Sequence, residues 1–267
     1  MQPMHPMLNI ALRAARKGGE FIIRQTNQLQ GLEITEKGRN DYVSQVDLMT
    51  ERAIIDVIHN SYPDHSILAE ESGAQGEHDY QWIIDPLDGT TNFLHGFPVF
   101  AVSIAVANKG RVEHAVVYDP MRQEIFTASN GEGAHLDGRR IRVSHRSTLG
   151  GCLIGTGFPF REDSPSLDDY LAMLAAVIKA TAGVRRPGAA ALDLCYVAAG
   201  RLDGFWELGL NTWDVAAGSL IIREAGGRIS DFRGTEDYLR SGNVVAGNPK
   251  IYAALSKLLA PHAKALV

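Results

Sequence analysis

The stretch WIIDPLDGTTNF contains two carboxylates, a glycine and two hydroxyls in a short turn that follows an apolar run. Asp85 and Asp88 are three residues apart, so both carboxylates and the carbonyl of Leu87 between them can face one point. Carboxylate and carbonyl oxygens on a tight turn are ligands that hard cations such as Mg²⁺ prefer. Gly89 allows close backbone approach, while the hydroxyl of Thr90 and the amides that follow can bind an anion. The stretch therefore predicts a site where Mg²⁺ bridges the protein and a phosphate oxygen.

The same residues are also typical of an ordinary turn. In the pattern Asp-Pro-x-Asp-Gly, an aspartate bonds to nearby backbone and the glycine adopts a positive φ angle. Because Pro86 cannot donate to a central ladder, we expect the strand that begins at Trp82 to stop near Asp85. The turn taken alone leaves both interpretations open.

Three more acids lie next to predicted elements. Glu70 follows a short apolar strand, residues 67–69, and would lie beside Asp85 if the two strands are neighbours. Acids at a strand end are otherwise usually solvated. Asp47 and Asp214 stand at the starts of apolar helices, where each is equally explained as an N-terminal cap that the helix dipole favours.

Hydrophobic periodicity predicts the elements that must position these side chains. We expect helices over residues about 6–28, 47–60, 166–181, 189–200, 213–227 and 249–262. We expect strands over residues about 67–69, 80–85, 98–110, 111–120, 124–129, 133–144, 152–158, 201–208 and 243–247. The segment 36–47 indicates a loop or short hairpin. The first half is rich in meandering strands and the second alternates strand and helix, which predicts layered α/β halves in one globule with a seam near residues 140–150.

The bulk composition narrows the function classes. The 267 residues are 45% hydrophobic, enough for one large domain or two closely packed halves. A formal charge of -5 and a pI near 6.0 provide no global basic field that would attract nucleic acid or membrane. Cys152 and Cys195 indicate reduced, buried residues of a cytosolic protein. We expect no membrane span and no secretory signal, because no apolar run is long enough.

Taken together, the motifs resemble those of the inositol monophosphatase family. The segments EKGRNDYVSQVD, AEES, WIIDPLDGTTNF and WDVAAG…EAGG occur in the order and spacing of that family. TGFPF, ALDLCYVAAGRLDGFWE and VAGNP look like its bacterial SuhB-type branch. The resemblance covers nearly the whole chain. It implies an α/β (α+β) fold, a five-layered αβαβα sandwich, forming a single domain over residues 1–267 with an N-terminal α+β half (about 1–145) and a C-terminal α/β half (about 146–267).

The resemblance also implies Mg²⁺-dependent hydrolysis of inositol 1-phosphate and related polyol or sugar phosphate monoesters by a cytoplasmic homodimer. The implied ligands of two or three Mg²⁺ ions per site are Glu70, Asp85, the Leu87 carbonyl, Asp88 and Asp214, with Asp85 shared between two ions and a weaker third ion relying on Glu70. The implied catalytic residues are Asp47, Thr90 and Glu70. The implied substrate contacts are Asp88, Gly89, Thr90, Ala190, Glu207 and Asp214. Inhibition by Li⁺ is a further expectation from the family.

Other functions stay open on the sequence alone. Proteins of the SuhB-type branch are associated with RNA polymerase and the ribosomal RNA antitermination assembly, so a binding role in which catalysis is secondary is the main alternative. Arg185 and Arg186 are the basic surface residues for such a partner, although a solvated strand edge or a dimer contact also explains them. A third reading keeps the chemistry but changes the substrate to fructose bisphosphate or adenosine 3′,5′-bisphosphate. Glu207 is either an acceptor for a polyol hydroxyl or a solvated acid at a strand end.

Overall fold

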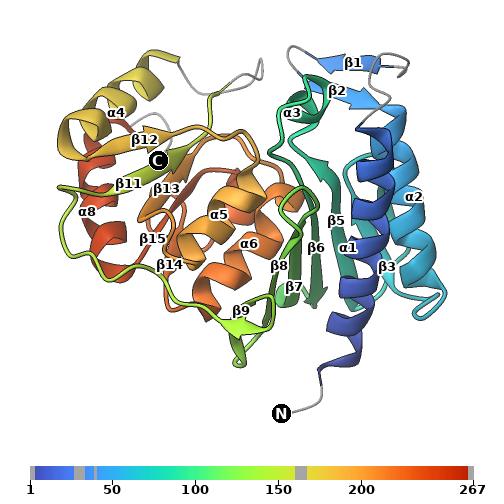
Figure 1. Cartoon of the computed structure of the whole chain (residues 1–267). Coiled ribbons are helices and arrows are strands. Elements are labelled where there is room, and N and C mark those ends of the chain that lie inside the picture. Colours follow the sequence, from blue (N-terminus) through green and yellow to red (C-terminus); the bar gives the residue numbers. More distant parts are fainter. Residues whose placement is uncertain (1–3, 27–33, 39–40, 160–166, 264–267) are drawn as a thin grey trace.

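The chain folds into alternating layers of helices and sheets, as Figure 1 shows from right to left. The computed structural model describes residues 4–26, 34–38, 41–159 and 167–263. Helices α1 and α2 form one outer layer, and a large sheet follows. Helices α5 and α6 lie between that sheet and a smaller one, and α4 and α8 cover the far side. The expected mixed α/β architecture of five layers is therefore confirmed.

Among the residues that the structure describes, the large sheet has eight strands and carries most of the first half of the chain. Their order is β10-β9-β8-β7-β6-β5-β3-β4, and neighbours run antiparallel except for β3 and β5. The strand bounds are β3 Ser66–Ala69, β4 Gly73–Gln75, β5 Tyr80–Asp88, β6 Ala101–Asn108, β7 Arg111–Asp119, β8 Glu124–Ser129, β9 Gly133–Leu136 and β10 Arg139–Arg140.

Helices α1 (Pro6–Gln25) and α2 (Gln45–His59) cover one face of the large sheet. Side chains alternate along β5 because a strand has a period of two. Trp82 and Ile84 pack in the core cluster below α1 and α2, whereas Ile83 belongs to the cluster shared with the middle helices. Ile83 therefore faces the interior of the sandwich, and Asp85, two residues further along the strand, points the same way.

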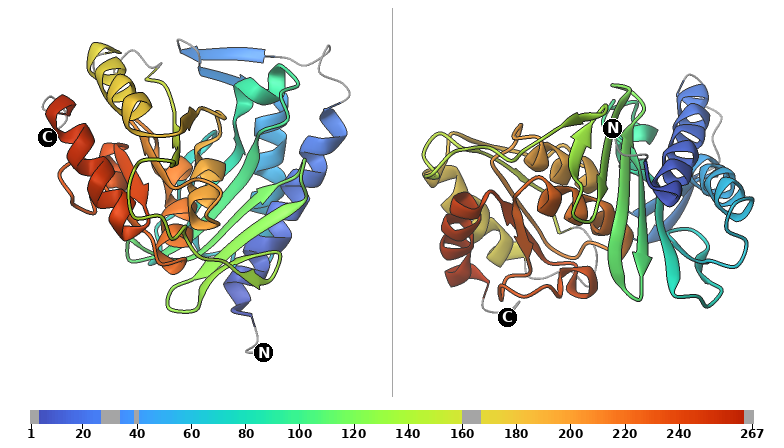
Figure 2. Two further views of the ribbon diagram at one scale, coloured as in Figure 1. Left: turned by 60° about the vertical axis from the view of Figure 1, so that its left-hand side comes forward. Right: turned by 90° about the horizontal axis from the view of Figure 1, so that it is seen from below.

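The smaller sheet, in the part of the chain that the structure describes, has five strands in the order β12-β11-β13-β15-β14. Their bounds are β11 Leu153–Thr156, β12 Gly183–Arg185, β13 Gly204–Glu207, β14 Arg228–Ser230 and β15 Val244–Gly247. The helices of this half are α4 Leu167–Ala180, α5 Ala190–Ala198, α6 Thr212–Glu224, α7 Tyr238–Ser241 and α8 Pro249–Leu259, followed by a 3₁₀ turn at Ala260–His262. The two views of Figure 2 show α5 and α6 packed between the sheets.

The remaining elements are short, and most were not predicted. A two-stranded hairpin of β1 (Ile34–Gly38) and β2 (Asp41–Ser44) fits the expected loop or hairpin. Helix α3 (Thr90–Leu94) and the strands β4, β12 and β14 were missed because segments of three to five residues carry too little periodicity.

Residues 27 and 28, at the end of the first predicted helix, lie outside the described residues. Within the described ranges, no helix is both long and apolar enough to cross a membrane. The single-domain assignment stays a prediction.

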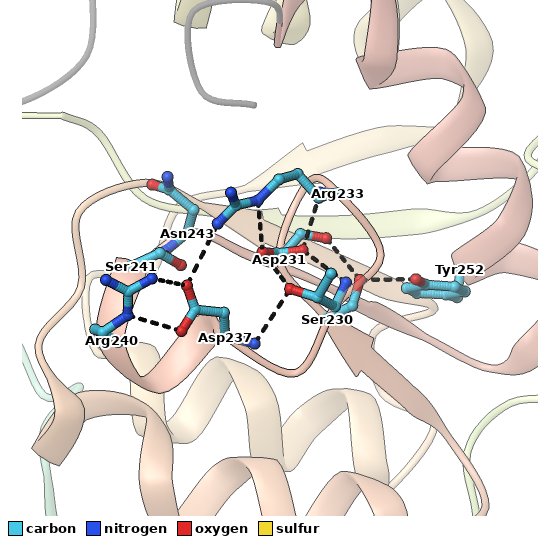
Figure 3. Close-up of polar contacts among 9 residues, drawn as sticks. Ser230, Asp231, Arg233, Asp237, Arg240, Ser241, Asn243 and Tyr252 are labelled. Carbon is cyan, nitrogen blue, oxygen red and sulfur yellow. Dashed lines mark hydrogen bonds and ion pairs between the residues drawn. The ribbon is translucent and has the colours of Figure 1, made fainter.

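A network of charged side chains closes the loop between β14 and α7 (Figure 3). Asp231 is buried and accepts hydrogen bonds from the backbone amides of Arg233 and Thr235 and from the Thr235 hydroxyl. Burial alone would raise the pKa of Asp231, but these hydrogen bonds lower it below its usual value. Asp237 pairs with Arg240 at 2.6 Å and with Arg233 at 3.3 Å. The loop is therefore fixed where the chain passes from β14 toward β15.

The two middle helices approach each other closely at Gly218. A Cβ atom at this position of α6 would lie 2.6 Å from Cβ and Cδ1 of Leu194 on α5. An alanine is ordinarily better than glycine in a helix by about 1 kcal/mol. Here the missing side chain is what lets α5 and α6 pack into one thin layer between the sheets.

We predict that Gly218→Ala destabilises the protein despite its better helix propensity. Overpacking a close helix contact costs about 1–3 kcal/mol, and the free energy of unfolding in urea should fall by that amount. Leu194→Ala removes the overlapping Cδ1 and Cγ but keeps Cβ, so part of the clash is relieved and the double variant should lose less stability than the sum of the two single changes. Strict additivity, or a stabilised Gly218→Ala variant, would show that the contact is not tight.

Candidate active site

One pocket gathers nearly all of the residues that the sequence predicts to be functional. Its volume is about 470 Å³, and it lies between the ends of β3, β5 and β13 and the first turns of α3, α5 and α6. The residues that line it are Glu70, Asp85, Leu87, Asp88, Gly89, Thr90, Thr91, Asn92, His95, Arg186, Gly188, Ala189, Ala190, Glu207, Leu210 and Asp214. Asp47 is the one predicted residue outside this lining, and it lies directly behind Thr90.

A β-bulge brings Asp85 and Asp88 to the same face of β5. Side chains three apart on a regular strand would point to opposite faces. Asp85 pairs with Ser103 and Asp88 with Ala101, so three steps along β5 match two along β6. The extra residue is accommodated at a bulge that contains Pro86, which has no amide to donate. The expectation that the strand stops at Asp85 is therefore wrong, because the bulge lets the ladder continue to Asp88.

Asp85 lies at the centre of a cluster of four acids. Its side chain is 1% exposed, and burial raises its pKa well above the usual value. The neighbouring carboxylates of Glu70, Asp88 and Asp214 raise that pKa further, and Glu70 is also hydrogen-bonded to Asp85. These four residues come from three segments that are far apart in the sequence. The structure thus brings together the acids that the sequence could only place separately.

Backbone amides orient the other two aspartates of the cluster. Asp88 accepts from the amides of Ala190 at 3.2 Å and Ala191 at 2.7 Å, at the start of α5. Asp214 accepts from the amide of Asn211 at 2.7 Å and occupies the third position of α6. Burial and the nearby Asp214 carboxylate raise the pKa of Asp88 to about 7, although the α5 amides oppose the shift. Asp214 is therefore a helix-capping residue and a member of the cluster at once.

Asp47 and Thr90 form the hydrogen-bonded pair that the family resemblance implies. The Thr90 hydroxyl donates to Oδ1 of Asp47 at 2.8 Å and lies 3.1 Å from the Leu87 carbonyl. Oδ2 of Asp47 accepts from the amide and hydroxyl of Ser44 at 2.8 and 2.6 Å. Burial raises the pKa of Asp47, and these hydrogen bonds oppose the rise. One carboxylate oxygen thus fixes the start of α2 while the other faces the pocket through Thr90.

Gly89 has to be a glycine for two reasons. Its φ angle is +96°, in the left-handed region that residues with a side chain rarely adopt. A Cβ atom there would also lie 2.9 Å from the Val99 carbonyl and 3.3 Å from the Gly188 carbonyl. The turn between β5 and α3 therefore packs directly against the segment that precedes α5.

The residues expected to contact substrate line the side of the pocket that the second half of the chain forms. Ala190 is buried at the start of α5, and Glu207 is half-buried at the end of β13. Glu207 packs over Gly157, where any Cβ atom would overlap its carboxylate. Gly157 thus supplies the space that Glu207 occupies. The roles of Ala190 and Glu207 as substrate contacts stay predictions.

Two residues that line the pocket, Arg186 and Asn92, were not recognised from the sequence as part of it. Arg186, taken as a surface residue for a partner, borders the pocket and stacks 5.0 Å from the centre of the Phe158 ring. Asn92 donates to the carbonyls of Val99 and Pro187 at 2.7 and 2.9 Å, which ties α3 to the segment before α5. Asn92 could have been suspected from the sequence, because it lies only three residues after Gly89 of the DPLDG turn.

Asp193 is a further acid that the sequence did not single out. It is 1% exposed on α5, and its Oδ1 has no hydrogen-bond partner. Burial raises its pKa well above the usual value, and the carboxylates of Glu207 and Asp88 raise it further. No motif predicts such a residue, because its environment comes from β13 and β5, which are remote in the sequence.

The donor set fits a hard divalent cation. Four carboxylates and the Leu87 carbonyl are oxygen donors of the kind that Mg²⁺ takes, and a cation would offset the repulsion around Asp85. Within the described part of the chain, no three His, Cys, Asp or Glu side chains are arranged closely enough to hold a metal ion as they stand. The aspartates are instead turned partly toward backbone amides. The acids of the cluster therefore lie beside one another, with oxygens of its three aspartates engaged by backbone amides.

Known proteins resemble this chain over nearly its full length. The family model described as "Inositol monophosphatase family" matches residues 3–266. "Nus factor SuhB" from Pseudomonas aeruginosa is 56% identical over 264 residues, which are 97% of each chain. The solved structure of extragenic suppressor protein suhB from Bartonella henselae matches with a TM-score of 0.93 and 45% identity, over 96% of this chain and 98% of that one. An inositol monophosphatase from Anabaena matches with a TM-score of 0.83 and 36% identity, over 96% and 95%. Sequence, fold and acid cluster thus agree, and the chain belongs to the inositol monophosphatase family.

Proposed function

We propose that this protein hydrolyses inositol 1-phosphate and related polyol or sugar phosphate monoesters in an Mg²⁺-dependent reaction. The observation that carries the proposal is the convergence of four acids on one pocket beside the hydrogen-bonded pair of Asp47 and Thr90. Membership of the inositol monophosphatase family supports phosphatase chemistry. A phosphate monoester is highly anionic and hydrolyses very slowly without a catalyst, so a pocket built from acids needs cations to accept it.

The cation ligands are proposed from the donors that line the pocket. Glu70, Asp85 and the Leu87 carbonyl would hold a first Mg²⁺, and Asp85, Asp88 and Asp214 a second. Bound Mg²⁺ ions would acidify a water molecule and neutralise the charge of the phosphate and of the leaving oxygen. The bulge in β5 holds Asp85 and Asp88 on one face, and the starts of α5 and α6 fix the orientation of Asp88 and Asp214.

Asp47 and Thr90 are proposed to orient the attacking water. The Thr90 hydroxyl donates its proton to Oδ1 of Asp47, which leaves the oxygen of Thr90 free to accept from a water in the pocket. Ser44 holds the second oxygen of Asp47, so the carboxylate cannot turn away. Asp47 can therefore accept a proton from the water by way of the Thr90 hydroxyl, without contacting the substrate itself. Gly89 and Thr90 are proposed to contact the phosphate through their amides.

Substrate selection is proposed to depend on the second half of the chain. Glu207 lines the pocket and is proposed to accept hydrogen bonds from alcohol hydroxyls, and the small side chain of Ala190 is proposed to leave room for a ring. Asp88 and Asp214 line the same pocket and are proposed to contact the polyol as well. The homodimer and the cytoplasmic location that the resemblance implies stay predictions, and sedimentation of the purified protein tests the first.

Association with the transcription machinery is a second candidate function. The Pseudomonas aeruginosa relative that is 56% identical carries the name Nus factor SuhB. We propose that this chain also joins an RNA polymerase antitermination complex, a role that does not exclude hydrolysis. Arg185, exposed on the edge strand β12, is the basic side chain to test first.

One prediction for the hydrolytic activity concerns the substitution Asp88→Asn. Release of phosphate from myo-inositol 1-phosphate should require Mg²⁺ and fall by about 10²–10³-fold in this variant, because one charge that holds the cation is lost. Asp79→Asn is the matched control, since Asp79 is an exposed aspartate paired with Lys109 and lies outside the pocket. Hydrolysis that persists in Asp88→Asn, or that needs no divalent cation, would contradict the assignment.

A second prediction follows from the raised pKa values of Asp85 and Asp88. A folded-state pKa of about 7 for Asp88 lies above its unfolded value, so the folded chain holds a proton that the unfolded chain has lost. Without divalent cation, the free energy of unfolding should therefore fall as the pH rises from about 4 to about 7. Because Mg²⁺ needs the carboxylate form, its affinity should rise over the same range and then level off. Calorimetric titrations of Mg²⁺ from about pH 5.5 to 8.5 measure this, and a pH-independent affinity would contradict it.

The transcription role is tested by capture of purified RNA polymerase on the immobilised protein. If binding and hydrolysis are separate functions, Asp88→Asn should lose hydrolysis and keep capture, whereas Arg185→Glu should weaken capture because it reverses an exposed charge. Failure of the unaltered chain to capture polymerase, alone or with other antitermination factors present, would remove the second candidate and leave the first intact.

A further inference from the structure

Helix α2 carries a second buried acid one turn beyond Asp47. Glu51 is 3% exposed and lies four residues after Asp47, so both side chains are on the same face of the helix. Asp47 contacts Thr90, whereas Glu51 reaches a different segment. Neither the sequence motifs nor the proposed reaction assigns a role to Glu51.

The partners of Glu51 are two consecutive amides in the turn between β3 and β4. Its Oε2 accepts from the amide of Glu71 at 2.8 Å, and its Oε1 accepts from the amide of Ser72 at 2.9 Å. Both carboxylate oxygens are therefore engaged by one short turn. Hydrogen bonds of this kind, from backbone N–H to an ionised acceptor, are among the stronger ones in proteins.

This turn presents Glu70 to the acid cluster. Strands β3 and β4 pair up to Ala69 and Gly73, so the residues between them form a three-residue connection that begins with Glu70. The amide of Glu70 donates to the Ile84 carbonyl on β5 at 3.1 Å. Glu70 is thus held by β5 through its own amide and by α2 through the next two amides. Rotation of the turn would move the Glu70 carboxylate away from Asp85.

We propose that Glu51 is a positioning residue that fixes the turn of Glu70 and thereby sets the affinity of the site for its divalent cation. Helix α2 then supports both parts of the site, through Asp47 for the water-orienting pair and through Glu51 for the cation ligand. The inference rests on the proposed function, because it takes Glu70 as a ligand. Residues that orient metal ligands typically change metal affinity by about 10–100-fold when they are replaced.

Glu51→Gln is the informative substitution because it keeps the size of the side chain. A glutamine has one oxygen and one NH₂ group, so one of the two amides would face a donor instead of an acceptor. The turn can then no longer be held at both points. We expect the Kd for Mg²⁺, measured by calorimetry in the absence of substrate, to rise about 10–100-fold. We expect kcat to recover at saturating Mg²⁺, because Glu51 does not line the pocket.

Two further variants keep the test decisive. Asp56→Asn removes the same charge from an exposed position of α2, and its Mg²⁺ affinity should equal that of the unaltered chain. Glu51→Asp keeps the charge but shortens the reach, so a positioning role predicts weakened Mg²⁺ binding here too. This variant also decides the question if Glu51→Gln does not fold.

The outcomes separate this inference from the proposed function. Unchanged Mg²⁺ affinity in both Glu51 variants, with or without a lower unfolding temperature, would show that Glu51 only stabilises the fold. Weakened binding in Glu51→Gln with normal binding in Glu51→Asp would show an effect of charge and would overturn the positioning role. If the unaltered chain binds no Mg²⁺, the proposed cation site itself fails. Loss of affinity in both variants but not in Asp56→Asn supports the inference.

Discussion

Repulsion among buried carboxylates is the constraint on which the rest of this structure depends. Asp85 is almost fully buried, and Glu70, Asp88 and Asp214 all raise its pKa. Such a cluster is unfavourable on its own, since desolvation and like charge both disfavour ionised acids. The fold offsets this by directing three helix starts, those of α3, α5 and α6, toward the pocket. Their amides and dipoles bring partial positive charge to the place where the acids meet.

The middle layer of helices connects that constraint to the packing of the whole chain. Helices α5 and α6 both begin at the pocket and then run between the two sheets, where their apolar residues form one core with both. The amides at the start of α5 hold Asp88 of the large sheet, and α6 carries Asp214. Any shift of this layer would therefore move two acids of the cluster at once. The close contact at Gly218 keeps the layer thin enough for both sheets to contribute to the pocket.

The sequence predicted the layered α/β fold and most of the pocket, because the decisive acids lie in strong motifs at the ends of clearly periodic elements. It misread the end of β5, since Pro86 normally stops a central ladder and only the pairing with β6 reveals the bulge. Glu51 gave no signal, because its partners are amides, which every residue possesses. Arg186 is exposed as expected, but its position beside the pocket was not predicted, because it depends on how the segment after β12 packs against α3. Contacts between remote segments are what a single sequence leaves undetermined.

The two halves of the chain supply different groups to the pocket, and this affects how substrate preference can change among related proteins. On the proposed roles, the first half of the chain supplies Asp47, Glu70, Asp85, Asp88 and Thr90, which perform hydrolysis. The second half supplies Ala190 and Glu207, and Arg186 borders the same side. Two acids cross this division on the proposed roles, because Asp214 comes from the second half but would hold a cation, and Asp88 comes from the first half but would also contact the alcohol. Substitutions along β13 and the start of α5 can therefore exchange one alcohol for another without disturbing the hydrolytic groups, so relatives can share one reaction while differing in the metabolite on which it acts.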